Sequence, residues 1–212
     1  MAKENSFTLG LIIASILLII GGAVFFTKPK TVEQPRVVSS EILVRSDSSK
    51  IVAPNEQKVL VEFGDFQCPA CAAYHDLVKS VLEENKDSLT FVFRNFPLSQ
   101  HKYARQAAYA AEAAGVQGKY WEMYAKLYEN QTDWVNAESP VDTLLTYAKE
   151  LRLDETKFKS DMDSKETKDK VDRDYVDGVA AGVDSTPTFF VNGTKIDNPS
   201  SAQEFKSLIE SL

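Results

Sequence analysis

Residues 59–71 of the chain read VLVEFGDFQCPAC, an apolar run that stops at Cys68-Pro69-Ala70-Cys71. These are the only two cysteines among the 212 residues. A disulfide that closes so short a loop removes little chain entropy, so it would stabilise the fold only weakly. A thiolate in the first turn of a helix is stabilised by unpaired backbone N–H groups and by the helix dipole, which lowers its pKa into a range of roughly 3.5–7.5. The pattern therefore predicts a strand, then a helix that begins at the cysteines, and a site for thiol–disulfide exchange.

The residues around this motif predict a β–α–β unit. Residues 58–63 are mostly apolar, as expected of a strand buried on both faces. Residues 72–84 repeat apolar side chains at helical spacing, and residues 89–95 are a second strand candidate. This order implies two parallel strands joined by a right-handed crossover. Helices are predicted in the middle of the chain at residues 103–115, 119–130, 141–151, 155–162 and 167–182.

The C-terminal part predicts a hairpin followed by a closing helix. Asn192-Gly193 separates two short β-rich runs, residues 188–191 and 194–196, and is the strongest local hairpin signal because both turn positions need a positive φ. Residues 201–204 have the spacing of a capping box, and apolar residues at helical spacing follow. The two halves of the domain are therefore expected to complete one small sheet with helices on both faces.

The N-terminal region contains a candidate membrane anchor. Residues 7–26 carry no charge, and about 20 such residues in a helix match a hydrocarbon core of about 30 Å. We therefore expect a tail at residues 1–6, a transmembrane helix at 7–27, a linker at 28–50 and the folded domain at 51–212. A cleaved signal peptide is the alternative, but its apolar core is only about 7–15 residues and ends at a small-residue cleavage site. No cysteine lies at the end of the span, which excludes a lipid-modified cysteine anchor.

The charge distribution argues against a nucleic-acid partner. Lys3, Lys28 and Lys30 against Glu4 give the first thirty residues a charge of +2, so the remainder carries −9 of the net −7. An acidic domain is poorly suited to bind phosphates. The Lys and Arg residues that flank the span slightly favour a cytoplasmic domain. We nevertheless expect the domain outside the cytoplasm, because an oxidant of other proteins suits an oxidising compartment.

Four stretches together resemble the DsbA-like branch of the thioredoxin superfamily. They are EFGDFQCPAC at 62–71, RNFPL at 94–98, AAEAAGVQGKYWEMYAKLYENQ at 110–131 and STPTFFVNG at 185–193. The resemblance implies a thioredoxin-like α/β fold, with βαβ and ββα halves around a central mixed sheet and an all-helical insertion at about residues 103–182. It also implies oxidation of cysteine-containing substrate proteins outside the cytoplasm, without a dissociable cofactor, and a membrane redox partner that reoxidises the chain.

The two cysteines are expected to have different roles. Cys68, at the start of the helix, would be the nucleophile that forms the mixed disulfide with substrate, and Cys71 would be the resolving thiol. The alternatives are a static pair or half of a metal site. A structural zinc site needs four N or S ligands, and only His75 and His101 could complete it. We therefore expect no metal.

Glu62 is a candidate proton acceptor for Cys71. It is an acid between the apolar residues Val61 and Phe63, six positions before Cys68. If it points inward, burial would raise its pKa and let it exchange a proton with Cys71; the alternative is a glutamate on a solvated strand face. In the superfamily a buried acid occupies this position. Asp65 is closer in sequence, but Gly64-Asp65 is typical of a turn.

The substrate is expected to contact four further residues. By resemblance, Thr186-Pro187 corresponds to the Thr–cis-Pro loop that faces the two cysteines, where free backbone groups can pair with an extended substrate. Pro69 and Ala70 lie between the cysteines. Many DsbA-like proteins carry a histidine at the position of Ala70, so we expect a less extreme thiolate pKa and a less oxidising couple.

Three alternatives to oxidation stay open from the sequence. A disulfide reductase or isomerase would use the same residues, because direction depends on the reduction potential and on the partner. A non-catalytic peptide-binding module or a metal chaperone could also use a thioredoxin scaffold. Four aromatic residues could line a peptide groove, although at their spacing a packed insertion core is the more common role. These are Tyr120, Trp121, Tyr124 and Tyr128.

Overall fold

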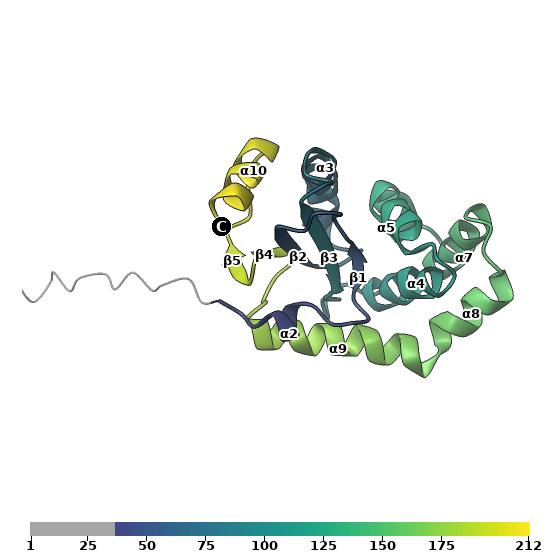
Figure 1. Ribbon diagram of the computed structural model, residues 1–212. Helices are drawn as coiled ribbons and strands as arrows, with labels where there is room; N and C mark the ends of the chain where they lie inside the picture. Colours follow the sequence, from purple (N-terminus) through teal and green to yellow (C-terminus); the bar gives the residue numbers. More distant parts are fainter. Residues whose placement is uncertain (1–36) are drawn as a thin grey trace, which may run out of the picture. The chain divides into compact units, whose positions relative to one another are not determined.

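Residues 37–212 are described by the structure, a computed structural model, and form one sheet with helices on both of its faces (Figure 1). The expected tail at residues 1–6 and the expected membrane anchor at 7–27 lie outside this range. Within residues 37–212, no helix is both long enough and apolar enough to cross a membrane.

The sheet has five strands in the order β1-β3-β2-β4-β5. The strands are β1 (Ser49–Ile51), β2 (Lys58–Gly64), β3 (Leu89–Asn95), β4 (Thr188–Val191) and β5 (Thr194–Ile196). Strands β2 and β3 are parallel and the other pairs are antiparallel, which confirms both the β–α–β unit and the hairpin. The hairpin turn has positive φ at both central residues, 49° at Asn192 and 87° at Gly193, as the Asn-Gly pair requires.

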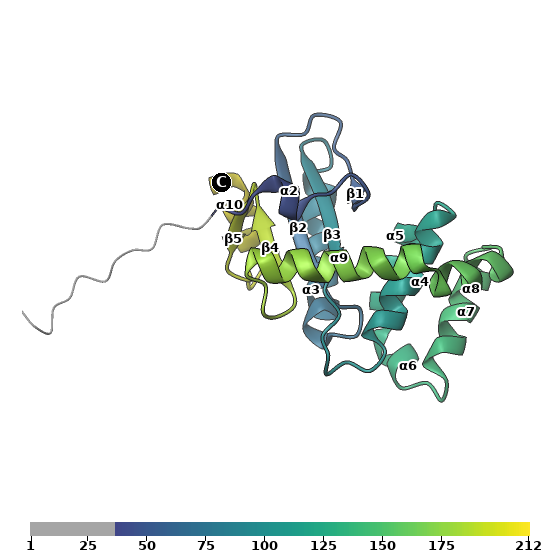
Figure 2. The same ribbon diagram turned by 90° about the horizontal axis from the view of Figure 1, so that it is seen from below.

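Different helices cover the two faces of the sheet. On one face α3 (Pro69–Glu84) packs beside α10 (Ala202–Ser211), and on the other the long helix α9 (Lys165–Ala181) crosses the strands (Figures 1 and 2). Gly178 permits this close crossing, because a Cβ there would lie 2.6 Å from the ring of Phe96. The helix α3 begins at Pro69, directly after its N-cap Cys68, which confirms the helix expected to begin at the cysteines; proline is well suited to the first helical position.

The helical insertion is confirmed between β3 and β4. Its helices are α4 (Ala104–Val116), α5 (Tyr120–Glu129), α6 (Gln131–Val135), α7 (Pro140–Glu150), α8 (Glu155–Asp163) and α9. The helix α6 was not expected from the sequence. On α5, Tyr120, Tyr124 and Tyr128 are buried in the core with Phe93 of the sheet, so these tyrosines are insertion core.

Part of the expected linker, residues 28–50, is folded onto the domain. Residues Ser40–Leu43 form the short helix α2, which contacts α9, and the side chain of Leu43 is buried. Ahead of it, Val37 forms a β-bridge with Thr194 of β5. After it, β1 pairs with β3 at the edge of the sheet. The three- and four-residue elements give no periodic signal in the sequence, and tertiary contacts hold them in place.

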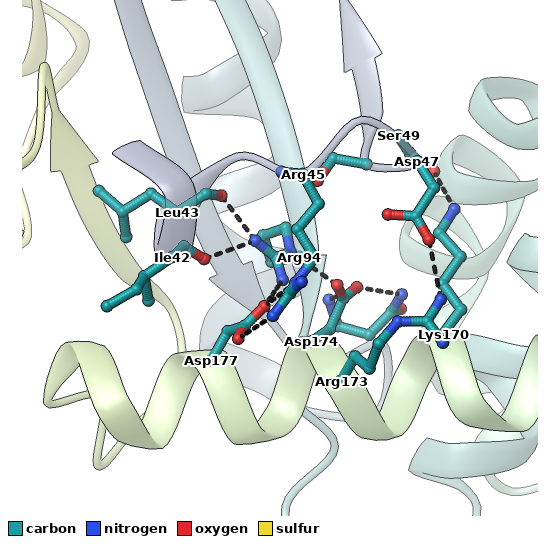
Figure 3. A network of polar contacts seen from close by, with 12 residues as sticks. Ile42, Leu43, Arg45, Asp47, Ser49, Arg94, Lys170, Arg173, Asp174 and Asp177 are labelled. Atoms are coloured by element: carbon teal, nitrogen blue, oxygen red, sulfur yellow. Dashed lines mark hydrogen bonds and ion pairs between the residues drawn. The ribbon is translucent and has the colours of Figure 1, made fainter. Parts of the chain in front are cut away.

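Several of these tertiary contacts involve Arg94 of β3, whose side chain is fully buried (Figure 3). Its Nε donates to Asp174 and its Nη2 to Asp177, both at 2.6 Å and both on α9. Its Nη1 donates to the backbone carbonyl oxygens of Ile42 and Leu43 at 2.9 and 2.7 Å. Because a buried charge that loses its partner costs about 3–5 kcal/mol, Arg94 joins β3, α9 and α2 into one unit.

Candidate active site

The two cysteines lie at the junction between β2 and α3, in a turn that Asp65 organises. Asp65 is buried; its Oδ1 accepts from the N–H of Gln67 at 2.7 Å, and its backbone carbonyl accepts from the N–H of Cys68 at 3.0 Å. Its Oδ2 accepts from the N–H of Leu98 at 2.9 Å and pairs with His101 Nδ1 at 2.7 Å. The turn role expected for Asp65 is therefore what the structure shows, and His101 supports the same turn.

Gln131, the first residue of α6, fixes this turn from the side of the insertion. Its Nε2 donates to the carbonyl oxygens of Phe66 and Cys68 at 2.8 and 2.9 Å, and the side chain is buried. Gln131 was not expected at the site from the sequence, because the residues it holds are more than 60 positions earlier in the chain. The residues around it, ENQTDWVN at 129–136, are mostly polar and give no signal that one of them is buried at the site.

Cys68 occupies the N-cap position of α3 and is 7% exposed. As a thiol, it donates from Sγ to the carbonyl oxygen of Thr186 at 3.4 Å. Its pKa is lowered to about 5, first because the Cys71 thiol donates a hydrogen bond to its sulfur, with further hydrogen bonds from the backbone N–H groups of Cys71 and Ala70, while burial opposes the shift. Cys68 is therefore ionised at neutral pH.

Cys71 has the opposite character, although it is only one helical turn away. Its side chain is fully buried, and its Sγ accepts from the N–H of Asp65 at 3.5 Å. Burial is the largest cause that raises its pKa, and the hydrogen bond it gives to Cys68 and the charge of Glu62 act in the same direction. At neutral pH the pair thus consists of a thiolate at Cys68 and a thiol at Cys71.

Glu62 lies inside the sheet on β2 and is 1% exposed, which rules out the solvated strand face. It is flanked in register by Phe93 on β3 and Phe189 on β4. Its pKa is raised to about 8, mainly because the carboxyl group is buried and secondly because of the charge of Cys68. A buried carboxyl group whose pKa lies near neutrality has the properties of a general base or acid.

The loop before β4 faces the cysteines. The peptide bond between Thr186 and Pro187 is cis, as the resemblance implied, and the Thr186 carbonyl meets the Cys68 sulfur. Asn198 donates from Nδ2 to the Pro187 carbonyl at 3.0 Å and so holds the loop. Pro69 and Ala70 are exposed beside this contact, so the four residues expected to meet substrate lie around the sulfur of Cys68.

The two histidines do not gather around the cysteines. His101 is hydrogen-bonded to Asp65, as described above, and His75 points between the rings of Tyr124 and Tyr128 on α5. Within residues 37–212, no group of three or more His, Cys, Asp or Glu side chains is arranged to hold a metal ion.

Comparison with known proteins yields a family and a set of partial relatives. A family model described as Thioredoxin matches residues 51–211. Curated relatives include the Na⁺/H⁺ antiporter NhaA 1 of Mycolicibacterium vanbaalenii, 32% identical over 217 residues and 100% of this chain, and NhaA 1 of Salinispora arenicola, 37% identical over 161 residues and 75% of this chain. The chain spans only 34% and 24% of the lengths of these two proteins.

Solved structures share the whole architecture. BdbD from Bacillus subtilis in its oxidised form is 26% identical, with a TM-score of 0.66 over 84% of this chain and 96% of that chain. Alpha-DsbA1 from Wolbachia pipientis is 19% identical (TM-score 0.70; 80% and 92% covered). MdbA from Actinomyces oris, described as a thiol-disulfide oxidoreductase, is 18% identical (TM-score 0.64; 84% and 89% covered). The last two likenesses bear on the fold alone.

Proposed function

Because the chain belongs to the thioredoxin family and folds like a protein named DsbA, we propose that it exchanges disulfide bonds with cysteine-containing proteins through Cys68 and Cys71. The reaction class is protein thiol–disulfide oxidoreduction, the class given for the Actinomyces oris protein. The antiporter names belong to proteins that are about three times as long, so they do not define the activity of this chain.

One observation carries this proposal, the asymmetry between the two sulfur atoms. Cys68 lies at a helix N-terminus next to an exposed surface and faces the Thr186-Pro187 loop, whereas Cys71 is fully buried behind it. A static structural pair needs no ionised member. A thiolate is the nucleophile in disulfide exchange, and a thiol of low pKa is also the better leaving group.

In the oxidising direction, a substrate thiolate attacks the sulfur of Cys68 in the Cys68–Cys71 disulfide. The S–S bond breaks, Cys71 leaves with the electron pair, and it takes a proton from Glu62. A second substrate thiolate then attacks the substrate sulfur of the mixed disulfide, and Cys68 leaves as a stabilised thiolate. The substrate dithiol is thereby oxidised and the cysteine pair is reduced.

The role as oxidant rests on the stability of the reduced form. Hydrogen bonds that favour the Cys68 thiolate stabilise the reduced protein and make the disulfide a stronger oxidant. A reductase or isomerase would use the same residues. Equilibration of the pair with glutathione separates these roles, because a potential near that of thioredoxin, about −270 mV, would favour reduction.

The location of the domain outside the cytoplasm is part of the same proposal. It is supported by the uncharged residues 7–26 and by the need of an oxidant for an oxidising compartment. A membrane redox partner would then reoxidise Cys68 and Cys71. Release of the full-length chain from membranes by alkaline carbonate would contradict the anchor.

The proposed function predicts an unusually acidic thiol. In the reduced full-length chain, ultraviolet absorbance of the thiolate should titrate with a midpoint near pH 5, because the folded structure lowers the pKa of Cys68. The signal should be fully present at neutral pH and be lost as the pH falls through this value. Cys68→Ser should remove it and should reduce the oxidation of an unfolded dithiol protein to the level of buffer. A midpoint near about 8.5, the value of an ordinary thiol, would indicate a non-catalytic pair.

A further inference from the structure

His75 is a buried ionisable residue that takes no part in the steps of disulfide exchange described above. It lies on α3, four residues after Cys71, and is 7% exposed. Within the described residues 37–212, neither of its ring nitrogens has a hydrogen-bond partner. Buried polar atoms without a partner are rare in folded proteins, and each one calls for a specific explanation.

Other unpaired polar atoms lie in the same interior layer. The ring of His75 packs against Tyr124 and Tyr128, with ring centroids 5.3 and 5.5 Å apart. Both tyrosine hydroxyls and one carboxyl oxygen of Glu62 are also buried without a partner among residues 37–212. Four side chains that can each donate or accept a proton therefore share one layer between α3, α5 and the sheet.

The layer extends to the active site. A Cβ at Gly64 would lie 3.0 Å from the hydroxyl of Tyr128. Glu62 comes two residues before Gly64 on β2, so both residues face the same side of the sheet. Burial raises the pKa of both Tyr124 and Tyr128, and the charges of Glu62 and Cys71 raise them further, as expected of close neighbours. Tyr124 and Tyr128 therefore lie next to His75 on one side and close to the Glu62–Cys71 pair on the other.

On its other side, His75 reaches solvent through a cavity between α3 and α5. The cavity has a volume of about 340 Å³, and His75 and Tyr124 are among its lining residues, together with Leu82 and Trp121. At its rim, Glu129 is exposed, and its Oε1 lies 3.8 Å from His75 Nε2. A cavity of this size has room for several water molecules.

The exchange reaction needs such a route. Each time the Cys68–Cys71 disulfide is reduced, Glu62 gives a proton to Cys71 and is left as a carboxylate, and because its pKa is raised to about 8 it takes up a new proton at neutral pH. Before the disulfide is reformed, Glu62 has to release that proton so that it can accept the one from Cys71. Because Glu62 is 1% exposed, the proton has to cross the interior of the protein to reach water.

We propose that His75 carries this proton between Glu62 and water in the cavity, across the layer that holds Tyr124 and Tyr128, with water bridging the polar atoms that have no protein partner. The inference rests on the proposed function, and His75 acts through Glu62 without touching the substrate. A neutral imidazole is suited to this step, because one ring nitrogen accepts a proton while the other donates one.

The charged groups around His75 are compatible with a neutral ring. From α3 these are Asp76 and Lys79, and from α5 Glu129. Burial is the largest influence and lowers the pKa of His75, against the opposing charges of Glu129 and Asp76. The imidazole is therefore uncharged at neutral pH, the form in which it can both accept and donate.

The test compares two substitutions of His75 in the full-length chain. The rate at which Cys71 resolves a mixed disulfide on Cys68 is measured by stopped flow between about pH 6 and 8, with and without added imidazole. His75→Phe keeps a ring between the tyrosines and His75→Ala enlarges the cavity. Both variants should be slowed at least about tenfold, at the low end of the effect of a proton-transfer group. Added imidazole should restore His75→Ala and leave His75→Phe slow.

Leu82→Ala is the matched control, because it enlarges the same cavity and leaves the imidazole in place. It should resolve at the wild-type rate and should not respond to imidazole. Wild-type rates in both His75 variants, or a slow His75→Ala that imidazole does not restore, would overturn the relay. A wild-type chain that does not exchange disulfides at all would instead overturn the proposed function, and the same assay shows this first.

Discussion

Replacing Cys71 with alanine is expected to stop the reaction at the mixed disulfide. Cys71→Ala removes the hydrogen bond that contributes most to lowering the pKa of Cys68. The Cys68 thiolate can still attack a disulfide-bonded protein, because it keeps its N-cap position on α3 and its hydrogen bonds from backbone N–H groups. The intramolecular thiol that would resolve the product is missing, and well-placed intramolecular groups act with effective concentrations of about 10⁵–10⁸ M. The complex should therefore persist for as long as no external thiol is added.

Non-reducing electrophoresis and mass spectrometry of the trapped peptide would measure this complex. Cys68→Ala is the matched control, and it should trap almost nothing, because the remaining Cys71 is fully buried and its pKa is raised. If Cys68→Ala trapped the substrate through Cys71 equally well, the assignment of nucleophile and resolving thiol would have to be reversed.

Substitution of Glu62 with glutamine is expected to slow resolution of the mixed disulfide by about 10²–10⁴-fold, the usual effect of removing a general base. Glutamine has nearly the shape of glutamate and carries no charge, so the fold should be retained. In the wild type, the pKa of Glu62 is raised, mainly by burial, so only a small fraction is ionised at pH 6. The wild-type rate should therefore rise with pH, with an inflection at or below about 8, because Cys68 carries no charge in the mixed disulfide.

Stopped-flow kinetics between about pH 6 and 8 would show this difference, since Glu62→Gln should lose the pH dependence as well as the rate. Glu56→Gln removes an exposed carboxylate shortly before β2 and should behave as the wild type. An unchanged rate in Glu62→Gln would leave the buried carboxyl with a purely structural role.

Local sequence patterns predicted the elements that carry the chemistry. The run from residue 59 to 71 gave β2 and the start of α3, and Asn192-Gly193 gave the hairpin, because each signal lies within a few residues. The burial of Glu62 followed from its apolar neighbours on the strand. The cis bond at Thr186-Pro187 came from the family resemblance alone, since a proline by itself is seldom cis.

Contacts between distant residues could not be predicted in this way. Gln131 holds carbonyl groups of the active-site turn that are more than 60 residues away, and Arg94 holds those of α2 more than 50 residues away. Neither α2 nor β1 has enough residues to show a period. Their stability comes from partners that only the folded chain brings together, so the sequence assigned residues 28–50 wholly to a linker.

Because α2 is bound to Arg94 on the domain, fewer residues remain free to connect the domain to the proposed membrane anchor. With the proposed anchor ending at residue 27, a free linker through residue 50 would let the domain reach about 80 Å from the membrane when fully extended, at about 3.3–3.6 Å per residue. Because the chain joins the domain at Val37, residues 28–36 can span at most about 30 Å. If residues 7–27 are the anchor, the domain would be attached close to the bilayer, and Cys68 would act on proteins near the membrane before those that have diffused away.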